Sequence, residues 1–249
     1  MRMAVAEILA AVEKKIKTKE EREYFLIHEA RYEYIIRQIG HIGSIGRMRV
    51  LDVGCYPYHL GAAMEMIGCD VYGISSSHEP IKSKKVAVCN IETDRFPFED
   101  NYFDLVVCTE VLEHLPQSPA HAIREMYRVT KTHGHVLITT PNITRSINRA
   151  KMLLGKSVTY PLSQVLENEG KGSNIYHRHN REYTLDEVTT LLTHANWNVE
   201  TARYFVSYTP FRRRVVPDAL WLKAGKTANY ALMMMAASLR DTLFVLGRK

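Results

Sequence analysis

The chain has 249 residues and a formal net charge of +6, with 46% hydrophobic and 24% charged residues. This length and composition are typical of one globular domain with an additional lobe, and they exclude a repetitive or low-complexity chain. No uncharged run reaches the ~18 residues that span a bilayer, which also excludes a membrane-spanning chain.

The positive charge is concentrated in the last fifth of the chain. Residues 203–249 carry nine Lys or Arg residues against two Asp residues, whereas the rest of the chain is nearly neutral. This concentration indicates either an anionic partner or an ordinary solvated basic face. The cluster Arg212, Arg213 and Arg214, beside Phe211 and Trp221, could contact a membrane surface or a phosphorylated acceptor. A nucleic-acid partner is not favoured, because one arginine cluster without an RNA-binding module is weak evidence.

The four cysteines lie on or beside predicted strands in the first half of the chain. Their spacings match no zinc site, so we interpret them as small core residues in a reduced, cytoplasmic compartment. They are Cys55, Cys69, Cys89 and Cys108.

Apolar residues at helical spacing predict two helices at the start of the chain, at 3–17 and 20–39. Together with the linker that follows, they form a helical segment over residues 1–46. This segment either packs on the main domain or covers its pocket as a lid. The side chains considered for the lid are Tyr24, Tyr32 and Tyr34.

The remaining residues, 47–249, alternate between short apolar runs and amphipathic segments. In chain order they predict a strand at 48–53, a helix at 59–68, strands at 70–74, 85–89 and 103–109, a helix at 118–130, a strand at 135–139, helices at 143–154 and 185–194, and strands at 197–205 and 241–249. A long loop at 155–183 and a basic and apolar insert at 206–240 interrupt this order.

Near-continuous apolar strands that alternate with helices indicate an α/β fold with a doubly wound, mainly parallel sheet. Right-handed crossovers bring the carboxyl ends of parallel strands to one edge, where such sheets bind their ligands. The residues expected at that edge are Asp52 to Tyr56, Ser75 to Ser77, Asn90 to Glu92 and Thr109 to His114.

Four ordered motifs carry a resemblance to a known family. They are VLDVGC at 50–55, VYGIS at 71–75, FPFEDNYFDLVVCTEVLEHL at 96–115 and REMYRVTKTHGHVLITTPN at 124–142. In this order they resemble the class I S-adenosylmethionine-dependent methyltransferases, in particular those with small-molecule or glycan substrates. The resemblance implies a Rossmann-like, seven-stranded sheet whose last two strands form an antiparallel hairpin. A nicotinamide dehydrogenase is a poorer match, because Gly54 and Gly61 do not form the Gly-x-Gly-x-x-Gly motif.

The resemblance also implies S-adenosylmethionine as the cofactor and places its binding residues. Asp52, Gly54 and Cys55 match the turn that holds the methionine part of the cofactor. Ser75 and Ser76 match the ribose position, and the turn after the third strand matches the adenine position. The other implied residues of the cofactor site are Tyr56, Asn90, Ile91, Glu92, Thr109 and Glu110.

The sequence departs from the family pattern in two places. Tyr56 and Tyr58 stand where the family has glycines, and the side chain of Tyr56 could either block the cofactor or line its site. Ser75 stands where the family has an acid that accepts hydrogen bonds from the ribose, and a hydroxyl makes a weaker bond without charge assistance.

Methyl transfer to a hydroxyl requires that a base or a metal remove the proton of the acceptor. The candidate catalytic residues are Glu113 and His114, at the predicted sheet edge, and His179 in the long loop. Glu110, Glu113 and His114 together with a later His resemble the metal site of small-RNA 2′-O-methyltransferases and ubiquinone-pathway O-methyltransferases. Three interpretations stay open: a structural motif, a base at His114 or His179, or a metal site. The first is favoured, and no metal is assigned.

We therefore expect an S-adenosylmethionine-dependent methyltransferase that acts on an oxygen atom of a small molecule, a glycan or a lipid-linked intermediate. One alternative is a catalytically silent binding protein with this fold, suggested by Tyr56, Tyr58 and Ser75. The other is a metal-dependent RNA-end 2′-O-methyltransferase. We expect a cytoplasmic protein with a peripheral membrane contact through Arg212 to Arg214, and the sequence leaves the oligomeric state open.

Overall fold

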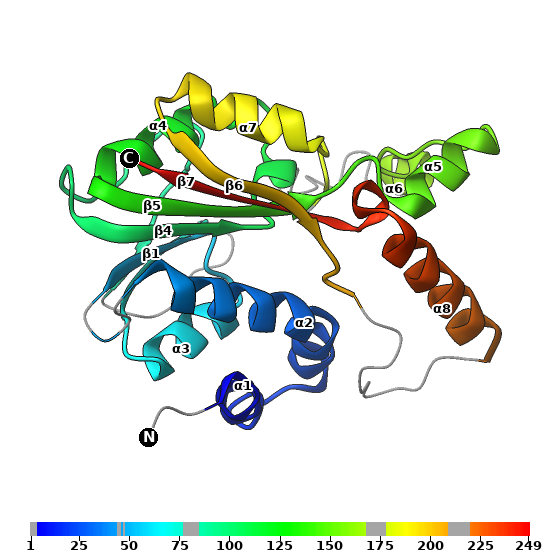
Figure 1. The fold of residues 1–249 in the computed structure, drawn as a ribbon, viewed down its shortest axis with the longest axis horizontal. Helices are drawn as coiled ribbons and strands as arrows, with labels where there is room; N and C mark the ends of the chain where they lie inside the picture. The colour runs from blue at the N-terminus through cyan, green and yellow to red at the C-terminus, as the bar shows by residue number, and fades with distance from the viewer. Residues whose placement is uncertain (1–3, 44–45, 47, 77–84, 168–177, 209–219) are drawn as a thin grey trace.

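The computed structural model describes residues 4–43, 46, 48–76, 85–167, 178–208 and 220–249. Its centre is a seven-stranded sheet with the strand order β3-β2-β1-β4-β5-β7-β6 (Figure 1). The strands are β1 Arg49–Val53, β2 Asp70–Ser75, β3 Val86–Val88, β4 Phe103–Thr109, β5 Thr130–Pro141, β6 Asn198–Phe205 and β7 Thr242–Arg248. The first five strands are parallel, and β7 runs antiparallel to both β5 and β6. The predicted doubly wound sheet with a final antiparallel hairpin is confirmed.

Helices cover both faces of the sheet. The lower layer in Figure 1 contains α1 Val5–Glu13, α2 Lys19–Ile42 and α3 His59–Met66, and the upper layer contains α4 Ala120–Val129 and α7 Leu185–His194. Beyond one end of the sheet lie α5 Ser146–Leu153, α6 Leu162–Glu167 and α8 Leu220–Met235. Because apolar side chains leave the sheet on both faces, two buried clusters form, one under each layer of helices.

The N-terminal helical segment packs on the sheet through its tyrosines. Tyr34 stacks on Phe205 of β6 with ring centroids 4.1 Å apart, and Tyr32 is buried beside Phe25. Tyr24 alone of the three lid candidates lines the cavity described below. The core position expected for the four cysteines is also observed, because all four thiols are free and buried.

Three sequence expectations differ from the structure. The strand expected at 135–139 begins at Thr130, because Thr130 already pairs with Phe103 across an irregularity in the ladder. The loop at 155–183 contains the short helix α6, and the insert at 206–240 contains α8. The second helix was missed although its sequence, LWLKAGKTANYALMMM, has no proline and is rich in the good helix formers Leu, Ala, Met and Lys.

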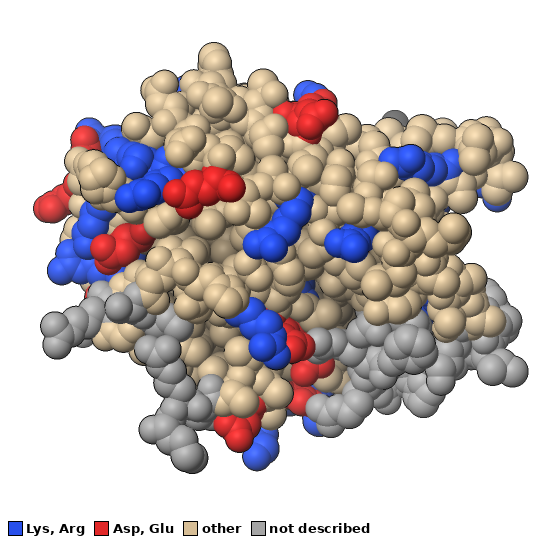
Figure 2. All heavy atoms as spheres, viewed as in Figure 1, with Lys and Arg blue, Asp and Glu red and all other residues tan. Residues whose placement is uncertain are grey.

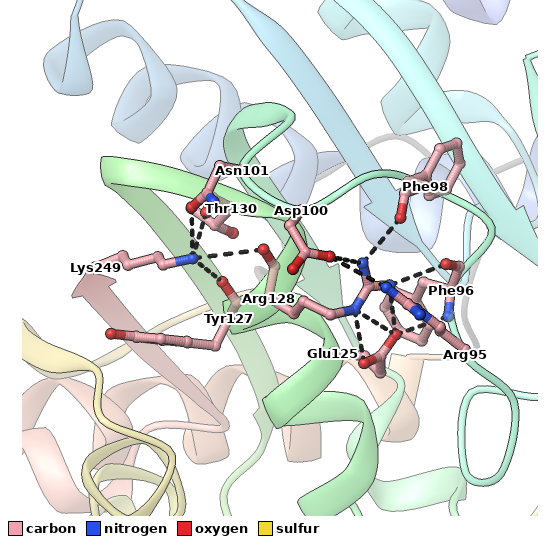
Figure 3. A network of polar contacts seen from close by, with 10 residues as sticks. All are labelled: Arg95, Phe96, Phe98, Asp100, Asn101, Glu125, Tyr127, Arg128, Thr130 and Lys249. Carbon is pink, nitrogen blue, oxygen red and sulfur yellow. Dashed lines mark hydrogen bonds and ion pairs between the residues drawn. The ribbon is translucent and has the colours of Figure 1, made fainter.

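A polar network joins the turn before β4 to the C-terminal end of β7. The Nζ of Lys249 donates to the carbonyl oxygens of Tyr127 at 2.7 Å and Thr130 at 2.8 Å (Figure 3). Arg128 of α4 bonds to Glu125 and Asp100 and to two backbone carbonyls of the same turn. These bonds fix the segment that precedes β4. The opposite end of β4 reaches the cavity, so the network also helps to position that strand.

Charged side chains on the face shown in Figure 2 lie mainly over the sheet and its neighbouring helices, and few lie over the end formed by α5 and α8. None of the helices in the described part of the chain combines the length and the apolar character that a membrane crossing requires.

Candidate functional site

A cavity of about 1050 Å³ opens at the carboxyl ends of β1, β2 and β4 and is closed on one side by α2. Its walls include ten of the residues singled out from the sequence: Gly54, Tyr56, Ser75, Ser76, Asn90, Ile91, Glu110, Glu113, His114 and His179. They come from five separate stretches of sequence. The parallel sheet brings four of them together at one edge, and the segment that carries His179 adds the fifth. A cavity of this size at this edge is typical of a ligand site in an open α/β sheet.

The turn after β1 requires a glycine. Gly54 has φ +77°, and a Cβ at this position would lie 2.4 Å from Cγ2 of Val111. The N–H groups of Gly54 and Cys55 both donate to the carbonyl oxygen of Ile74, at 2.9 and 3.0 Å. The backbone of β1 is therefore tied to β2 where the cavity begins, and the missing side chain lets Val111 pack against the turn.

The two tyrosines that replace family glycines behave differently. Tyr56 lies on the cavity wall with 52% of its side chain exposed, so it lines the cavity rather than filling it. Tyr58 turns away from the cavity: its ring covers Gly61, and its hydroxyl donates to Oε1 of Glu65 at 2.9 Å. The departure at these positions therefore leaves the cavity open.

Four of the expected cofactor residues lie outside the cavity wall. Asp52 is buried beneath the turn, and this burial raises its pKa to about 7. The Sγ of Cys55 packs against Gly73 of β2. Glu92 is buried and accepts hydrogen bonds from the N–H groups of Gln117 and Ser118, and Thr109 is paired in register with Thr139 of β5. Contact of these four residues with a cofactor stays a prediction, because they lie behind the residues that line the cavity.

Ser75, at the end of β2, is 1% exposed and lines the cavity. Its Oγ has no hydrogen-bond partner among the residues that the structure describes. A buried hydroxyl without a partner is unfavourable, and a ligand hydroxyl in the cavity could supply the missing bond. The cavity wall next to it continues with Asn90 and Ile91, the expected adenine region, and with Asp94, which sequence reasoning missed. These residues fit a nucleoside.

The Glu110–His114 stretch forms a tight turn and no α-helix. Glu110 adopts the left-handed conformation with φ 54°, and Leu112–His114 form a single 3-10 turn. The two carboxylates consequently have different partners. Glu110 accepts a hydrogen bond from Thr139 Oγ1 at 2.9 Å and forms an ion pair with Nη1 of Arg31 at 3.1 Å.

Glu113 is completely buried and receives a hydrogen bond from Thr140 Oγ1 at 2.9 Å. Its other oxygen, Oε1, has no hydrogen-bond partner in the described part of the chain and lies 3.8 Å from Nε2 of His114. Burial, together with the charge of Glu110, raises the pKa of Glu113 well above its usual value. The surroundings of Glu113 therefore oppose its charged form.

His114 and His179 approach each other at the cavity wall, with ring centroids 4.9 Å apart and planes at 88°. The Nδ1 of His114 lies 3.1 Å from the carbonyl oxygen of Arg178, and the Nδ1 of His179 lies 3.0 Å from Oε1 of Glu182. Because carbonyl and carboxylate oxygens only accept, each Nδ1 is assigned the proton. This tautomer leaves the lone pair on Nε2 of each ring.

Glu182 holds His179 in place and is itself held by α5. Arg145 donates two hydrogen bonds to its carboxylate, the second at 3.0 Å, and Asn148 adds a third contact at 3.3 Å. Burial opposes the charge of Glu182, but the bonds from His179 and Arg145 outweigh it and lower its pKa to about 2. Glu182 is thus a permanent anion behind His179, and nothing in its sequence position revealed this role.

The donor atoms of Glu113, His114 and His179 all lie within 4.8 Å of one another. Two imidazole nitrogens and one carboxylate oxygen are a set that a divalent metal ion accepts. Glu110, which belongs to the metal motif that the sequence resembles, is instead engaged by Arg31 and Thr139. The structure therefore separates Glu110 from the other three residues.

Helix α2 contributes Tyr24, one of the lid candidates, together with His28 and Arg31, which the sequence did not indicate as site residues. Tyr24, His28 and Arg31 follow one another at helical spacing and all line the cavity. Burial, followed by the charge of Arg31, lowers the pKa of His28 to about 3, so this imidazole is neutral. Arg31 is buried, and its Nε has no hydrogen-bond partner in the described part of the chain.

Comparison with known proteins shows which family has this arrangement. A family model described as "Methyltransferase domain" matches residues 20–202. Among curated proteins, a ubiquinone biosynthesis O-methyltransferase of Acinetobacter baylyi is 34% identical over 113 residues, which are 41% of this chain and 47% of that protein. The protein of the same name from Acinetobacter baumannii is 30% identical over 190 residues, covering 66% of this chain and 74% of that one. The first match thus spans about half the length of the relative.

Solved structures agree on the architecture. A methyltransferase structure from Archaeoglobus fulgidus, described as S-adenosylmethionine-dependent, has a TM-score of 0.59 at 14% identity and covers 89% of this chain and 94% of its own. A structure from Thermotoga maritima, described as a possible histamine N-methyltransferase, has a TM-score of 0.57 at 15% identity and covers 98% and 99% of the two chains. At such low identity these likenesses concern the fold alone.

Proposed function

Because this chain belongs to the class I S-adenosylmethionine-dependent methyltransferases, we propose that it transfers a methyl group to an oxygen atom of a small-molecule, glycan or lipid-linked acceptor. The choice of oxygen is supported by the relatives named O-methyltransferases that are 30–34% identical to this chain. It is also supported by the imidazole pair at the cavity wall, because a hydroxyl acceptor must lose a proton.

The residues of the cavity fit the cofactor. The turn at Gly54 would receive the methionine part, the unpartnered Oγ of Ser75 would bond to a ribose hydroxyl, and Asn90 with Ile91 would border the adenine. When bound, the cofactor supplies an electrophilic methyl group on a sulfonium ion. The protein contributes mainly by aligning the acceptor with this group and by excluding water from the cavity. The catalytically silent alternative loses its main support, since Tyr56 and Tyr58 leave the cavity open.

We assign the role of base to His179. Its Nδ1–H donates to the anionic Glu182, which orients the ring and stabilises the imidazolium that forms when Nε2 takes a proton. His114 packs edge-on against this ring and restricts its orientation. The buried Glu113 accepts a hydrogen bond from Thr140 and so maintains the short turn, and we assign it a supporting role in the wall.

The single observation that carries the proposal is the hydrogen bond of 3.0 Å between His179 and Glu182. His179 lies at the wall of a cavity that Ser75 and Gly54 also line. A test has two parts. Calorimetry with S-adenosylmethionine and S-adenosylhomocysteine measures binding to the cavity, and transfer of a labelled methyl group to a panel of hydroxylated small molecules measures activity. Absence of binding at millimolar cofactor, with the protein folded, would contradict the proposal.

A second candidate function is metal-assisted O-methylation, including the RNA-end reaction. It is favoured by one observation, the convergence of Glu113, His114 and His179 within 4.8 Å. A divalent ion held by these residues would lower the pKa of a bound hydroxyl and replace the base. The two candidates differ in their response to a chelator: His179 acting alone predicts unchanged activity, and the metal predicts loss that added Mg²⁺, Mn²⁺ or Zn²⁺ restores. The contact expected through Arg212 to Arg214 lies outside the described residues.

A further inference from the structure

The end of the molecule formed by α5, α6 and α8 exposes many large apolar side chains. This end protrudes beyond the sheet on the right of Figure 1. Leu153, at the last turn of α5, is 88% exposed, and Leu154 next to it is 72% exposed. We call this set the apolar tip, and its members are Ile147, Met152, Leu153, Leu154, Leu162, Leu166, Leu232, Met234 and Met235. Exposed apolar side chains are common singly, but many of them at one end of the molecule, on α5 and α8, which contact each other, and on α6, indicate an interaction surface.

Cations accompany the apolar tip without acidic partners. No Asp or Glu occurs between residues 142 and 166, whereas Arg149, Lys151 and Lys156 all lie there and are exposed. None of these three forms an ion pair with a carboxylate that the structure describes. On the face shown in Figure 2, blue spheres but no red ones lie over α5. Around α5 the surface is therefore apolar and cationic at once, although α6 ends at the acidic residue Glu167. An apolar and cationic composition is that of a segment that lies on an anionic bilayer.

We propose that the apolar tip and its cations dock this enzyme on the surface of an anionic phospholipid bilayer. The inference rests on the proposed function, because it favours the lipid-linked class among the possible acceptors. It uses residues other than Arg212 to Arg214. The leucines at the end of α5 enter the boundary between headgroups and acyl chains, and Lys151 and Lys156 remain among the anionic headgroups.

A second copy of the chain is a poorer occupant of this surface. In a twofold dimer the same patch meets itself, so the cations of one protomer would face those of the other without intervening carboxylates. Like charges that lose water together oppose association. A bilayer with anionic headgroups has the opposite charge, and its interior accepts protruding leucines without requiring a complementary groove.

The proposed surface is connected to the cavity through α5. The first turns of this helix hold Glu182 through Arg145 and Asn148, and Glu182 bonds to His179 at the cavity wall. The last turn of the same helix carries Leu153. A bilayer that binds the far end of α5 would therefore lie on the side of the molecule where His179 borders the cavity, which suits an acceptor anchored in that bilayer.

The test is co-sedimentation of the full chain with vesicles of phosphatidylcholine alone and of phosphatidylcholine mixed equally with phosphatidylglycerol. We expect binding to the mixed vesicles that weakens with added salt, and little binding to the neutral ones. The double variant Leu153→Ser/Leu154→Ser should weaken binding at least tenfold, because two exposed leucines no longer enter the bilayer. Lys151→Gln should weaken it about fivefold, corresponding to ~1 kcal/mol for one cation near an anionic surface.

Matched controls lie elsewhere on the surface. Ile27→Ser removes an apolar side chain of α2 that is 40% exposed, and Lys15→Gln removes an exposed cation near α1; neither should change vesicle binding. Failure to bind mixed vesicles, or binding that the leucine pair does not affect, would overturn the inference. So would self-association that the leucine pair abolishes, because a second copy would then cover the tip.

Calorimetry with S-adenosylhomocysteine on the same preparations separates this inference from the proposed function. Cofactor binding without vesicle binding would refute only the lipid surface, and vesicle binding without cofactor binding would refute only the enzyme assignment. The leucine variant should bind the cofactor like the unchanged chain, since neither leucine lines the cavity.

Discussion

The guanidinium of Arg31, on α2, reaches across the cavity floor to the carboxylate of Glu110, at the end of β4, with Nη1 and Oε2 3.1 Å apart. Both side chains are largely buried, at 7% and 17% exposure, and Thr139 of β5 donates to the same carboxylate. This ion pair joins the N-terminal helical segment to the catalytic edge of the sheet. The first half of α2, from Glu20 to Arg31, therefore belongs to the site together with the strand ends.

Replacing only one partner of the Arg31–Glu110 ion pair should destabilise the fold. We expect Arg31→Met to lower the free energy of unfolding by about 3 kcal/mol, because it leaves the Glu110 carboxylate buried without its cation. The double variant Arg31→Met/Glu110→Gln should recover part of that loss, because no uncompensated charge remains. Urea denaturation without cofactor measures both. Equal losses in the single and double variants would mean that the pair contributes packing and no charge compensation.

Gly54→Ala should damage the turn after β1. The new Cβ would lie 2.4 Å from Val111 in a backbone with φ +77°, so we expect a loss of stability of about 2–4 kcal/mol and weaker cofactor binding. Gly155→Ala is the matched control, since Gly155 has φ +67° but no atom near its virtual Cβ, and it should cost only about 1 kcal/mol. Thermal unfolding of the two variants gives the difference, and similar losses would show that Val111 adapts.

Ser75→Ala should separate cofactor affinity from stability. The Oγ of Ser75 has no partner in the described part of the chain, so its removal should leave stability unchanged or slightly higher. Cofactor affinity should fall about fivefold, or ~1 kcal/mol, through loss of the bond to the ribose. Ser146→Ala has the opposite expectation: its Oγ donates to Asn229 at 2.6 Å, so stability should fall while affinity stays. Unchanged affinity of Ser75→Ala would place the ribose elsewhere.

Glu182→Gln should reduce turnover at least tenfold while cofactor affinity stays the same, because a neutral amide stabilises the imidazolium of His179 less well. Glu33→Gln alters a partly exposed carboxylate that is paired with Arg37 and should leave turnover unchanged. The kcat of each variant with saturating cofactor is the measurement. If Glu182→Gln retains full turnover, His179 is not the base.

Glu182 also predicts a pH dependence of stability. Its folded-state pKa is lowered from 4.5 to about 2, so its charge stabilises the fold above 4.5 and this contribution is lost as the pH falls toward 2. Urea denaturation through this range should show a smaller acid loss in Glu182→Gln than in the unchanged chain.

Asp52 should have the opposite pH dependence. Burial raises its pKa from 3.8 to about 7, so the folded state holds a proton that the unfolded chain releases, and stability should fall as the pH rises between these values. Asp52→Asn removes this titration. Its stability relative to the unchanged chain should therefore increase with pH across that window, as followed by urea denaturation at several pH values. A difference that does not change with pH would mean that Asp52 is charged at neutral pH.

The edge of the sheet could be predicted from the sequence because its residues follow apolar strands. Gly54, Ser75 and Asn90 each come directly after such a strand, and a parallel sheet necessarily collects those positions in one place. His114 could be placed at the same edge because it follows the fourth strand, whereas His179, in the long loop, was joined to it by the resemblance of the motif. The contributions of Arg31 and Glu182 were missed. Helical spacing shows which residues share a face of α2, but it does not show that this face contacts the cavity. Glu182 lies outside the helices and strands, and its sequence neighbours do not show that it contacts His179 and Arg145.

By itself, the sequence determined the architecture and the location of the cavity, since strand order, crossover hand and the glycine turn are local or topological properties. Only the tertiary structure decided how the charged groups pair: Arg31 with Glu110, Glu182 with Arg145 and His179, and Glu113 with the hydroxyl of Thr140. Such pairing depends on distances of a few ångström between elements far apart in the chain, and no periodicity or motif encodes those distances. The roles of otherwise similar acids at one site therefore follow from packing.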